Sequence, residues 1–366
     1  MTIRGRFIGP LLALVGIVVF VSAAAGGADT ATADSLVAED RPTSGPATSA
    51  KAFREKPFVV CEQLIAEPKL RTAGDMLFYC MDAPSPNAVA ELRQQQAALG
   101  RVPTVTLIVC AVTDQIQTIE SYAPVCDGFW VVPFYLPSKR APQKGDLIWT
   151  GYDHPLINRL RHIHSLTRKQ RVVAILTRRP FGNTVWGASG KRSWTTEELE
   201  WQVLAVIGAE FKGIHWRNRS NKRGIQTTSR RLERGLKRHA MELGKAHLVG
   251  WVNAPDAQPV SALASEKSLF IVLLNPDVMK LDRRCKAIGS RVERSVRSGR
   301  LSICPPPGLT VRNGRELSGQ PARVIQEGAK VLVEYSFMGG GKMFVFDLTG
   351  NAAQTKPAET PAPADN

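Results

Sequence analysis

Three aspartates lie at positions where their carboxyl groups could do acid–base chemistry. Asp82 follows the apolar segment 77–81, Asp114 follows the apolar segment 104–110, and Asp153 comes farther along the chain. A carboxyl group can donate or accept a proton in a transition state, and two facing carboxyl groups can divide the acid and base roles. If the chain is a catalyst, these three residues are its candidate catalytic groups. The alternative for Asp82 is that it caps the helix that follows.

A second group of side chains combines aromatic rings with cations. The group consists of Asp82, Tyr135, Trp149, Arg178, Arg179, Trp186, His215, Trp216 and Arg217. Trp and Tyr rings have flat apolar faces on which sugar rings stack, and arginines pair with carboxylate or sulfate groups. The alternative for each aromatic residue is packing beneath a loop. This group is the candidate ligand-binding set, and carbohydrate or an acidic polysaccharide is the expected ligand.

The segments that would position these residues alternate between strands and helices. Strands are expected at 77–81, 104–110, 129–134, 172–177 and 211–216, and helices are expected at 87–99, 155–167 and 196–207. Thr195 and Glu198 have the spacing of a capping box at the start of the last helix. Apolar strands that alternate with helices predict a parallel sheet covered by helices, with these strands adjacent in sequence order. A ligand would then bind at the carboxyl ends of the strands.

The remaining segments divide the chain into further regions. Residues 1–25 contain two arginines, an apolar run and then small residues, which predicts an export signal, with a retained membrane anchor as the alternative. The pattern then predicts a disordered linker (26–56), a barrel-like α/β domain (57–252), an antiparallel, β-sandwich-like domain (253–349) and a disordered tail (350–366). We therefore expect a secreted, periplasmic or cell-envelope protein.

All six cysteines follow the predicted signal, and an even number permits disulfides in an exported protein. Cys285 and Cys304 stand alone in the C-terminal part and are the expected pair. The other four are Cys61, Cys80, Cys110 and Cys126. They allow three pairings, and the alternative for those at strand positions is a buried free thiol. No two cysteines have the Cys-x-x-Cys spacing of a metal site, and the chain has no nucleotide-binding motif, so no metal or cofactor is expected.

The chain is strongly basic, with 48 Lys and Arg against 32 Asp and Glu and a net charge of +16. Nine of these cations fall between Arg217 and Arg238, where Glu233 is the single acid. A polar helix face explains part of this pattern, and a dense excess of one charge also attracts an anionic polymer. No helix-turn-helix, zinc-finger or aromatic RNA-binding signature accompanies the cations, so nucleic acid is not the expected partner.

The order of these segments resembles the second half of a glycoside-hydrolase-type (β/α)8 barrel followed by a β domain. The resemblance rests on FYCMDAP, PTVTLIVC, CDGFWVVPFYLP, VVAILTRR, SWTTEELEWQVLAVIGAEFKGIHW and LFIVLLNP. Such barrels have an Asp-Glu-Pro turn after the fourth strand, and the resemblance places Ala83 where that turn has its catalytic Glu. It places Thr177, Arg178 and Arg179 where related retaining enzymes have their nucleophile. Since glycoside hydrolysis uses two carboxyl groups, both familiar positions lack the required side chain.

The expected fold class is therefore α/β, with a partial or incomplete barrel-like parallel sheet, helices, and a C-terminal antiparallel β-domain. Too few residues precede 77–81 for three further βα units, so the sheet is open there, or residues 56–65 cover that edge, or a partner chain completes the barrel. The expected function is a non-catalytic glycosidase-like protein that binds carbohydrate or an anionic polysaccharide. The alternative is an active glycoside hydrolase that uses Asp82 with Asp114 or Asp153.

Overall fold

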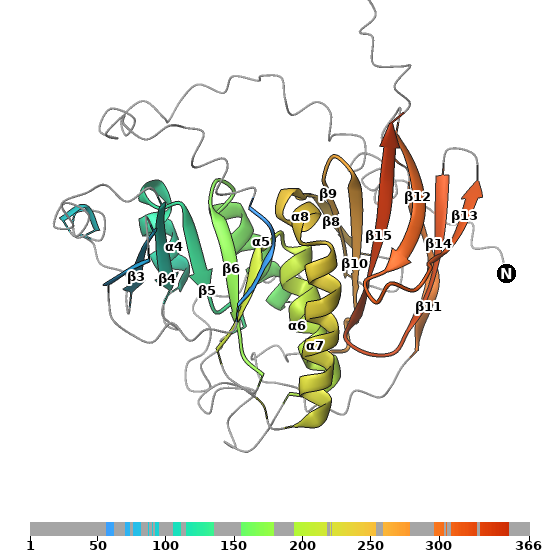
Figure 1. Cartoon of the computed structure of the whole chain (residues 1–366), viewed down its shortest axis with the longest axis horizontal. Coiled ribbons are helices and arrows are strands. Elements are labelled where there is room, and N and C mark those ends of the chain that lie inside the picture. Colours follow the sequence, from blue (N-terminus) through green and yellow to red (C-terminus); the bar gives the residue numbers. More distant parts are fainter. Residues whose placement is uncertain are drawn as a thin grey trace, which may run out of the picture.

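The computed structural model describes residues 56–61, 70–73, 76–81, 87, 90, 92–94, 105–110, 115–134, 155–178, 194–217, 220, 222–253, 259–278, 296–303, 305, 309–327 and 330–350. These residues form three β-sheets, and helix α6 lies between the first sheet and the five-stranded C-terminal sheet (Figure 1). The predicted signal, and nearly all of the predicted linker and tail, lie outside the described residues.

The first sheet has seven strands in the order β1-β7-β6-β5-β4-β3-β2. They are β1 (Val59–Cys61), β2 (Leu70–Ala73), β3 (Met76–Met81), β4 (Val105–Cys110), β5 (Gly128–Val131), β6 (Arg171–Leu176) and β7 (Gly213–Trp216). Neighbours from β1 through β7 to β3 pair parallel, and β2 pairs antiparallel with β3. The predicted parallel order from β3 to β7 is confirmed.

β1 occupies the edge beside β7, and β2 occupies the edge beside β3. The prediction that the β3 edge is either open or covered by residues 56–65 is therefore wrong. Val59 pairs with Gly213, where an added Cβ would lie 2.7 Å from Val59 Cγ2 and 2.9 Å from the Val59 carbonyl oxygen. Glycine therefore permits this close approach. Arg171 fixes the same segment, because its guanidinium donates to the carbonyls of Lys56 at 2.8 Å and Pro57 at 2.6 Å. No pairing between β1 and β2 closes the sheet among the described strands.

Helices pack on one face of this sheet. They are α4 (Gln115–Tyr122), the 3-10 turn η2 (Ala123–Val125), α5 (Pro155–Leu166), α6 (Thr196–Gly208), α7 (Arg223–Arg238) and α8 (Ala240–Lys245). The predicted capping box begins α6: Glu198 N donates to Thr195 Oγ1 at 3.1 Å, and Thr195 N donates to Glu198 Oε2 at 2.9 Å. These bonds satisfy backbone N–H groups that have no partner within the helix. None of the described helices is long and apolar enough to cross a membrane.

The C-terminal residues form antiparallel β-structure, as predicted, and it is divided into two sheets. One has the order β12-β15-β10-β9-β8, and the other has the order β11-β14-β13. The strands are β8 (His247–Asn253), β9 (Pro259–Ala264), β10 (Ser268–Leu274), β11 (Arg297–Ile303), β12 (Leu309–Glu316), β13 (Arg323–Glu327), β14 (Lys330–Phe337) and β15 (Gly341–Gly350). Apolar side chains of both sheets, including Leu273, Val333 and Phe346, form a core of their own.

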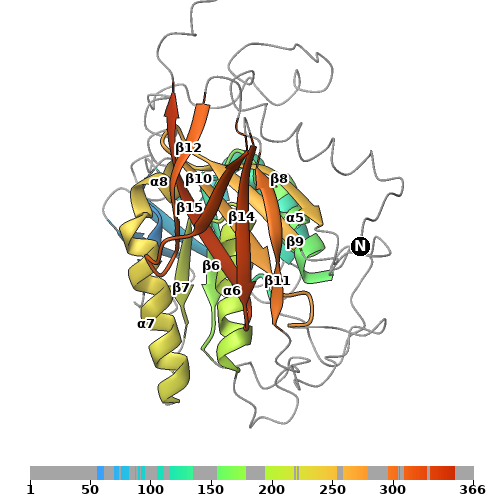
Figure 2. The same ribbon diagram turned by 90° about the vertical axis from the view of Figure 1, so that its right-hand side faces the viewer.

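Helix α6 lies between the parallel sheet and the five-stranded sheet, as Figures 1 and 2 show from two directions. Trp201 of α6 belongs to one apolar core that contains both Ile214 of β7 and Phe270 of β10. The turn between β14 and β15 also approaches α6 closely, because a Cβ on Gly340 would lie 2.1 Å from the carbonyl oxygen of Glu197. A single continuous core therefore joins the α/β part to the first C-terminal sheet.

Candidate functional site

The carboxyl ends of β5, β6 and β7 lie beside one another, which is where the sequence places the candidate ligand-binding residues. Four of those candidates, Arg178, His215, Trp216 and Arg217, are among the described residues. Outside the described residues lie Asp82, Ala83, Asp114, Tyr135, Trp149, Asp153, Arg179 and Trp186, together with the predicted disulfide pair Cys285 and Cys304. The roles of the residues in this second set stay predictions.

Side chains along these strands alternate between two faces of the sheet. Val131, Leu176 and Trp216 face the helices and belong to the core that contains α6. By alternation, Trp130 and His215 face the opposite side, away from α6. The strand ends therefore present two different surfaces, one occupied by helices and one that forms the inner side of the sheet.

Trp130 and His215 approach each other on that inner side. Their strands are separated by β6, so at the usual strand spacing their backbones are about 9 to 10 Å apart. Their ring centroids are only 5.0 Å apart, with the ring planes inclined by 39°. The two side chains lean toward each other, as side chains do on the concave face of a curved sheet.

His215 is a neutral polar group on this concave face. Its side chain is buried, at 3% exposure, and burial lowers its pKa to about 4, with the nearby charge of Arg217 acting in the same direction. Within the described part of the chain, Nδ1 of His215 has no hydrogen-bond partner. A neutral imidazole has one N–H donor and one acceptor. The exposed cation Arg217 follows two residues later.

Arg178 points to the other side, toward α7. Its Nη2 donates to Glu233 Oε1 at 3.0 Å, and its guanidinium carbon lies 4.9 Å from the ring centroid of Trp216. The side chains of Arg178 and Glu233 are only 9% and 13% exposed. The charge of Arg178 is thus neutralised inside the fold, and Trp216 packs beneath it.

Three residues at these strand ends, Trp130, Trp194 and Glu233, were not among the sequence candidates. Trp194 Nε1 donates to Thr177 Oγ1 at 3.4 Å, just beyond the end of β6. The two-residue alternation of β5 could have identified Trp130, because its apolar neighbours face the helices. Nothing local in the sequence identifies Glu233 as a partner of Arg178, because 55 positions separate the two residues.

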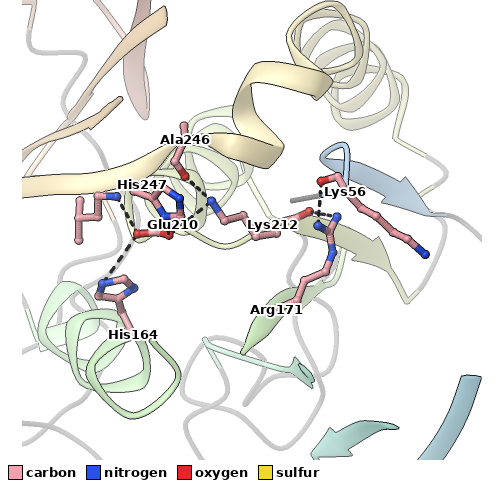
Figure 3. A network of polar contacts seen from close by, with 8 residues as sticks. Lys56, His164, Arg171, Glu210, Lys212, Ala246 and His247 are labelled. Carbon is pink, nitrogen blue, oxygen red and sulfur yellow. Dashed lines mark hydrogen bonds and ion pairs between the residues drawn. The ribbon is translucent and has the colours of Figure 1, made fainter. Parts of the chain in front are cut away.

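A polar network lies at the amino end of the parallel sheet (Figure 3). Glu210 follows α6 with a left-handed φ of 64°. Its carboxylate accepts a hydrogen bond from Leu248 N at 2.6 Å and lies 3.0 Å from His247 Nδ1 and 3.4 Å from Lys212 Nζ. Lys212 Nζ also donates to the carbonyl of Ala246. The network ties the turn before β7 to the first residues of β8.

This network stabilises the ionised form of the Glu210 carboxyl group. Burial alone would raise the pKa of Glu210, but the His247 hydrogen bond, the Lys212 charge and the Leu248 N–H together lower it to about 2. His164 Nε2 lies 3.9 Å from the same carboxylate, and burial lowers the pKa of His164. The described residues contain no group of three or more His, Cys, Asp or Glu placed to hold a metal ion. The arrangement is a structural junction between the α/β part and β8.

Comparison with known proteins gives a likeness of fold at low sequence identity. No family model matches the chain, and no curated protein matches it. Similar solved structures include an Anoxybacillus α-amylase, with 13% identity and a TM-score of 0.43 over 70% of this chain and 54% of the amylase. A Geobacillus thermoleovorans α-amylase complexed with acarbose has 11% identity and a TM-score of 0.46 over 74% of this chain and 60% of that one.

A family 39 glycoside hydrolase from Bacteroides cellulosilyticus has 10% identity and a TM-score of 0.34, over 67% of this chain and 51% of the hydrolase. The chain thus spans little more than half the length of these proteins. It is similar, at low sequence identity, to glycoside hydrolases of solved structure.

Proposed function

We propose that the chain is an exported, non-catalytic, glycosidase-like protein that binds an acidic carbohydrate at the carboxyl ends of β5, β6 and β7. The observation that supports this proposal best is the Trp130–His215 pair on the concave face. The indole of Trp130 is half-buried and has an apolar face, and the buried imidazole of His215 lies beside it, with the ring centroids 5.0 Å apart. The exposed cation Arg217 lies next to this pair and suits a carboxylate or sulfate on the sugar.

The non-catalytic part of the proposal rests on the side chains at the familiar catalytic positions. Ala83 cannot transfer a proton, and the end of β6 continues into Thr177 and Arg178 rather than a carboxylate. Of the described residues at the strand ends, Glu233 has a carboxylate, and that group accepts a hydrogen bond from Arg178. Because this carboxylate is only 13% exposed and is engaged by Arg178, it is not placed to act on a bound sugar.

Binding can be tested by titrating the full chain with a galacturonate trimer and with the neutral maltotriose, using calorimetry. We expect binding of the acidic trimer that weakens as salt is raised, because screening shortens the reach of the Arg217 charge. Arg217→Ala should weaken this binding, whereas Lys245→Ala, which removes an exposed cation from α8, should not. Equal affinity for both sugars in wild type and Arg217→Ala would contradict the proposal.

The absence of catalysis needs its own measurement. We expect no release of reducing ends from neutral or acidic oligosaccharides, and no rescue by Ala83→Glu, since a restored acid would still lack a second carboxylate. Turnover that Asp82→Ala abolishes would instead support the active hydrolase.

Export is tested separately by N-terminal sequencing of secreted protein, which should begin near Gly26. Recovery of Thr2 on a membrane-bound product would favour the anchor.

A further inference from the structure

The exposed side of α7 has four cations in one line. Arg223, Arg230, Arg234 and Lys237 are spaced by seven, four and three residues, so they lie on one face of the helix. All four are exposed, and none has an acidic partner in the part of the chain that the structure describes. At about 1.5 Å per residue they extend over about 21 Å. We call these four residues the α7 cation stripe.

The two ion pairs near the stripe do not neutralise its four cations, because the acids in those pairs bind other arginines. Glu233, the single acid of α7, is engaged by Arg178 of the parallel sheet. Arg231, on the flank of the stripe, pairs with Glu200 of α6 at 2.8 Å. The four cations of the stripe therefore face solvent as a row of like charges. Such a row attracts an extended polyanion more than it attracts a single small anion.

The apolar side of α7 is already used by the fold. Ile225, Leu232 and Leu236 are buried in the main core, on the side of the helix away from the stripe. A helix that lies on a membrane inserts its apolar face between the lipids. Because α7 has no such face available, its cations can attract a charged surface but cannot anchor the chain in a bilayer. This favours a polymer in solution over a lipid surface.

A cleft of about 560 Å³ adjoins the N-terminal end of the stripe. It lies between the start of α6, the first turns of α7 and the turn after β14. Its lining includes Thr196, Thr227, Thr228, Arg223, Glu200 and Met338. The lining also includes Glu197 and Arg231, and Arg231 pairs with Glu200. Three hydroxyls, two cations, two carboxylates and an exposed apolar side chain give the mixed polar and apolar surface that suits the hydroxyl groups and ring of a sugar unit. A duplex nucleic acid, whose charges lie on a stiff rod, has no part that would enter such a cleft.

We propose that the α7 cation stripe binds a linear anionic polysaccharide, with acid groups of the polymer on the four cations and one sugar unit in the adjoining cleft. The proposal rests on the proposed function, because the polymer is of the class expected at the strand ends. It adds a second surface, on the outer side of the fold, which extends the contact along the polymer. Affinity should therefore increase with polymer length.

The test compares a galacturonate trimer with long polygalacturonate on the full chain at several salt concentrations. The stripe variant is Arg223→Gln/Arg230→Gln/Arg234→Gln/Lys237→Gln. The matched control removes four exposed cations elsewhere and is Lys245→Gln/Lys267→Gln/Arg312→Gln/Lys330→Gln. The stripe variant should bind the long polymer about tenfold more weakly than the control at low salt. Its slope of log affinity against log salt should fall by about three, taking about 0.7 counterions released for each of the four cations, the value for a single-stranded polyanion.

A variant without a charge change tests the cleft. Thr227→Tyr fills the cleft beside the stripe and should weaken binding of polygalacturonate. Binding of duplex DNA, measured as a probe of charge alone, should be unchanged.

Trimer affinity that is sensitive to Arg217→Ala but not to the stripe variant would show that the two surfaces are separate. Failure of the trimer to bind would count against the proposed function, whereas failure of the stripe variant to differ from its control would overturn this inference.

Two further outcomes would also overturn it. The first is tighter binding of wild-type chain to phosphatidylglycerol vesicles than to polygalacturonate, which would make the stripe a membrane contact. The second is tighter binding to duplex DNA than to polygalacturonate at equal salt. That result would mean that the charge density of the polymer alone determines which ligand the stripe binds.

Discussion

Glu233 Oε1 lies 3.0 Å from Arg178 Nη2, in a contact that joins the end of β6 to the middle of α7. Both side chains are largely buried, and the guanidinium of Arg178 also lies over the ring of Trp216. A charge that is removed from water is stable in the protein interior only when an oppositely charged group lies beside it. The position of α7 on the sheet therefore depends on both residues.

Glu233→Gln should destabilise the fold, because it leaves the buried charge of Arg178 without its carboxylate. We expect the free energy of unfolding to fall by about 2 to 4 kcal/mol, measured by urea denaturation. The double variant Arg178→Met/Glu233→Leu should recover much of this loss, since it removes both charges together.

The control for that experiment is an exposed ion pair. Arg300 pairs with Glu334 at 3.0 Å, but Arg300 is 65% exposed. Arg300→Gln should therefore cost less than about 1 kcal/mol. Equal losses for Glu233→Gln and Arg300→Gln would show that burial of the first pair has no energetic consequence.

Gly213→Ala should loosen the contact between β1 and β7. The added methyl group would meet both the side chain and the backbone of Val59, and backbone cannot move aside cheaply. We expect a loss of about 1 to 3 kcal/mol in the free energy of unfolding, and faster amide hydrogen exchange in β1. Gly224→Ala is the matched control, because its new Cβ would lie 3.4 Å from Thr196 Cγ2 in a helix, where alanine is favoured.

Glu210 should make stability depend on pH in the acid range. Its pKa falls from the ordinary 4.5 to about 2 on folding, so its contribution is fully present above pH 4.5 and is lost as pH falls toward 2. The shift corresponds to a contribution on the order of 3 kcal/mol. Glu210→Gln should flatten the dependence of urea midpoints between pH 4.5 and 2. The exposed Glu266→Gln should leave that slope unchanged, and an unchanged slope in Glu210→Gln would contradict the assignment.

The pKa of His215 should lie well below that of an ordinary histidine. NMR of its ring protons should give a midpoint of about 4, from burial and then from Arg217. The unfolded chain takes up this proton near pH 6.5, so stability should decrease as pH falls from 6.5 to 4. His215→Gln keeps a neutral polar group and should remove this part of the decrease. A midpoint near 6.5 would mean that the ring is exposed to solvent.

Elements with a strong local pattern could be predicted from the sequence. The apolar strands β3 to β7 and their order follow from their alternation with helices, and the start of α6 follows from Thr195 and Glu198. Strands β8, β9 and β11 were not predicted. Their sequences, HLVGWVN, PVSALA and RSGRLSI, contain small or polar residues that favour no single structure. Only pairing with distant strands makes them part of a sheet.

The candidate site was predictable in location but not in orientation. The sequence places Arg178 and His215 at neighbouring strand ends, and both lie there. Which face each side chain occupies depends on strand register, and Arg178 points to α7 because Glu233 lies there. The contact between β1 and β7 was also missed, since it joins positions more than 150 residues apart in the chain, and neither Val59 nor Gly213 has a local signature for the other.

Helix α6 has one consequence for the integrity of the whole chain. Its side chains are buried against both the parallel sheet and the five-stranded sheet. A chain cut between β7 and β8 would leave α6 with one sheet and expose its other side to water, and the freed five-stranded sheet would lose the apolar surface that covers it. Neither fragment would then retain a complete interior. The two parts therefore depend on each other for folding, and we expect neither part to be stable when it is produced without the other.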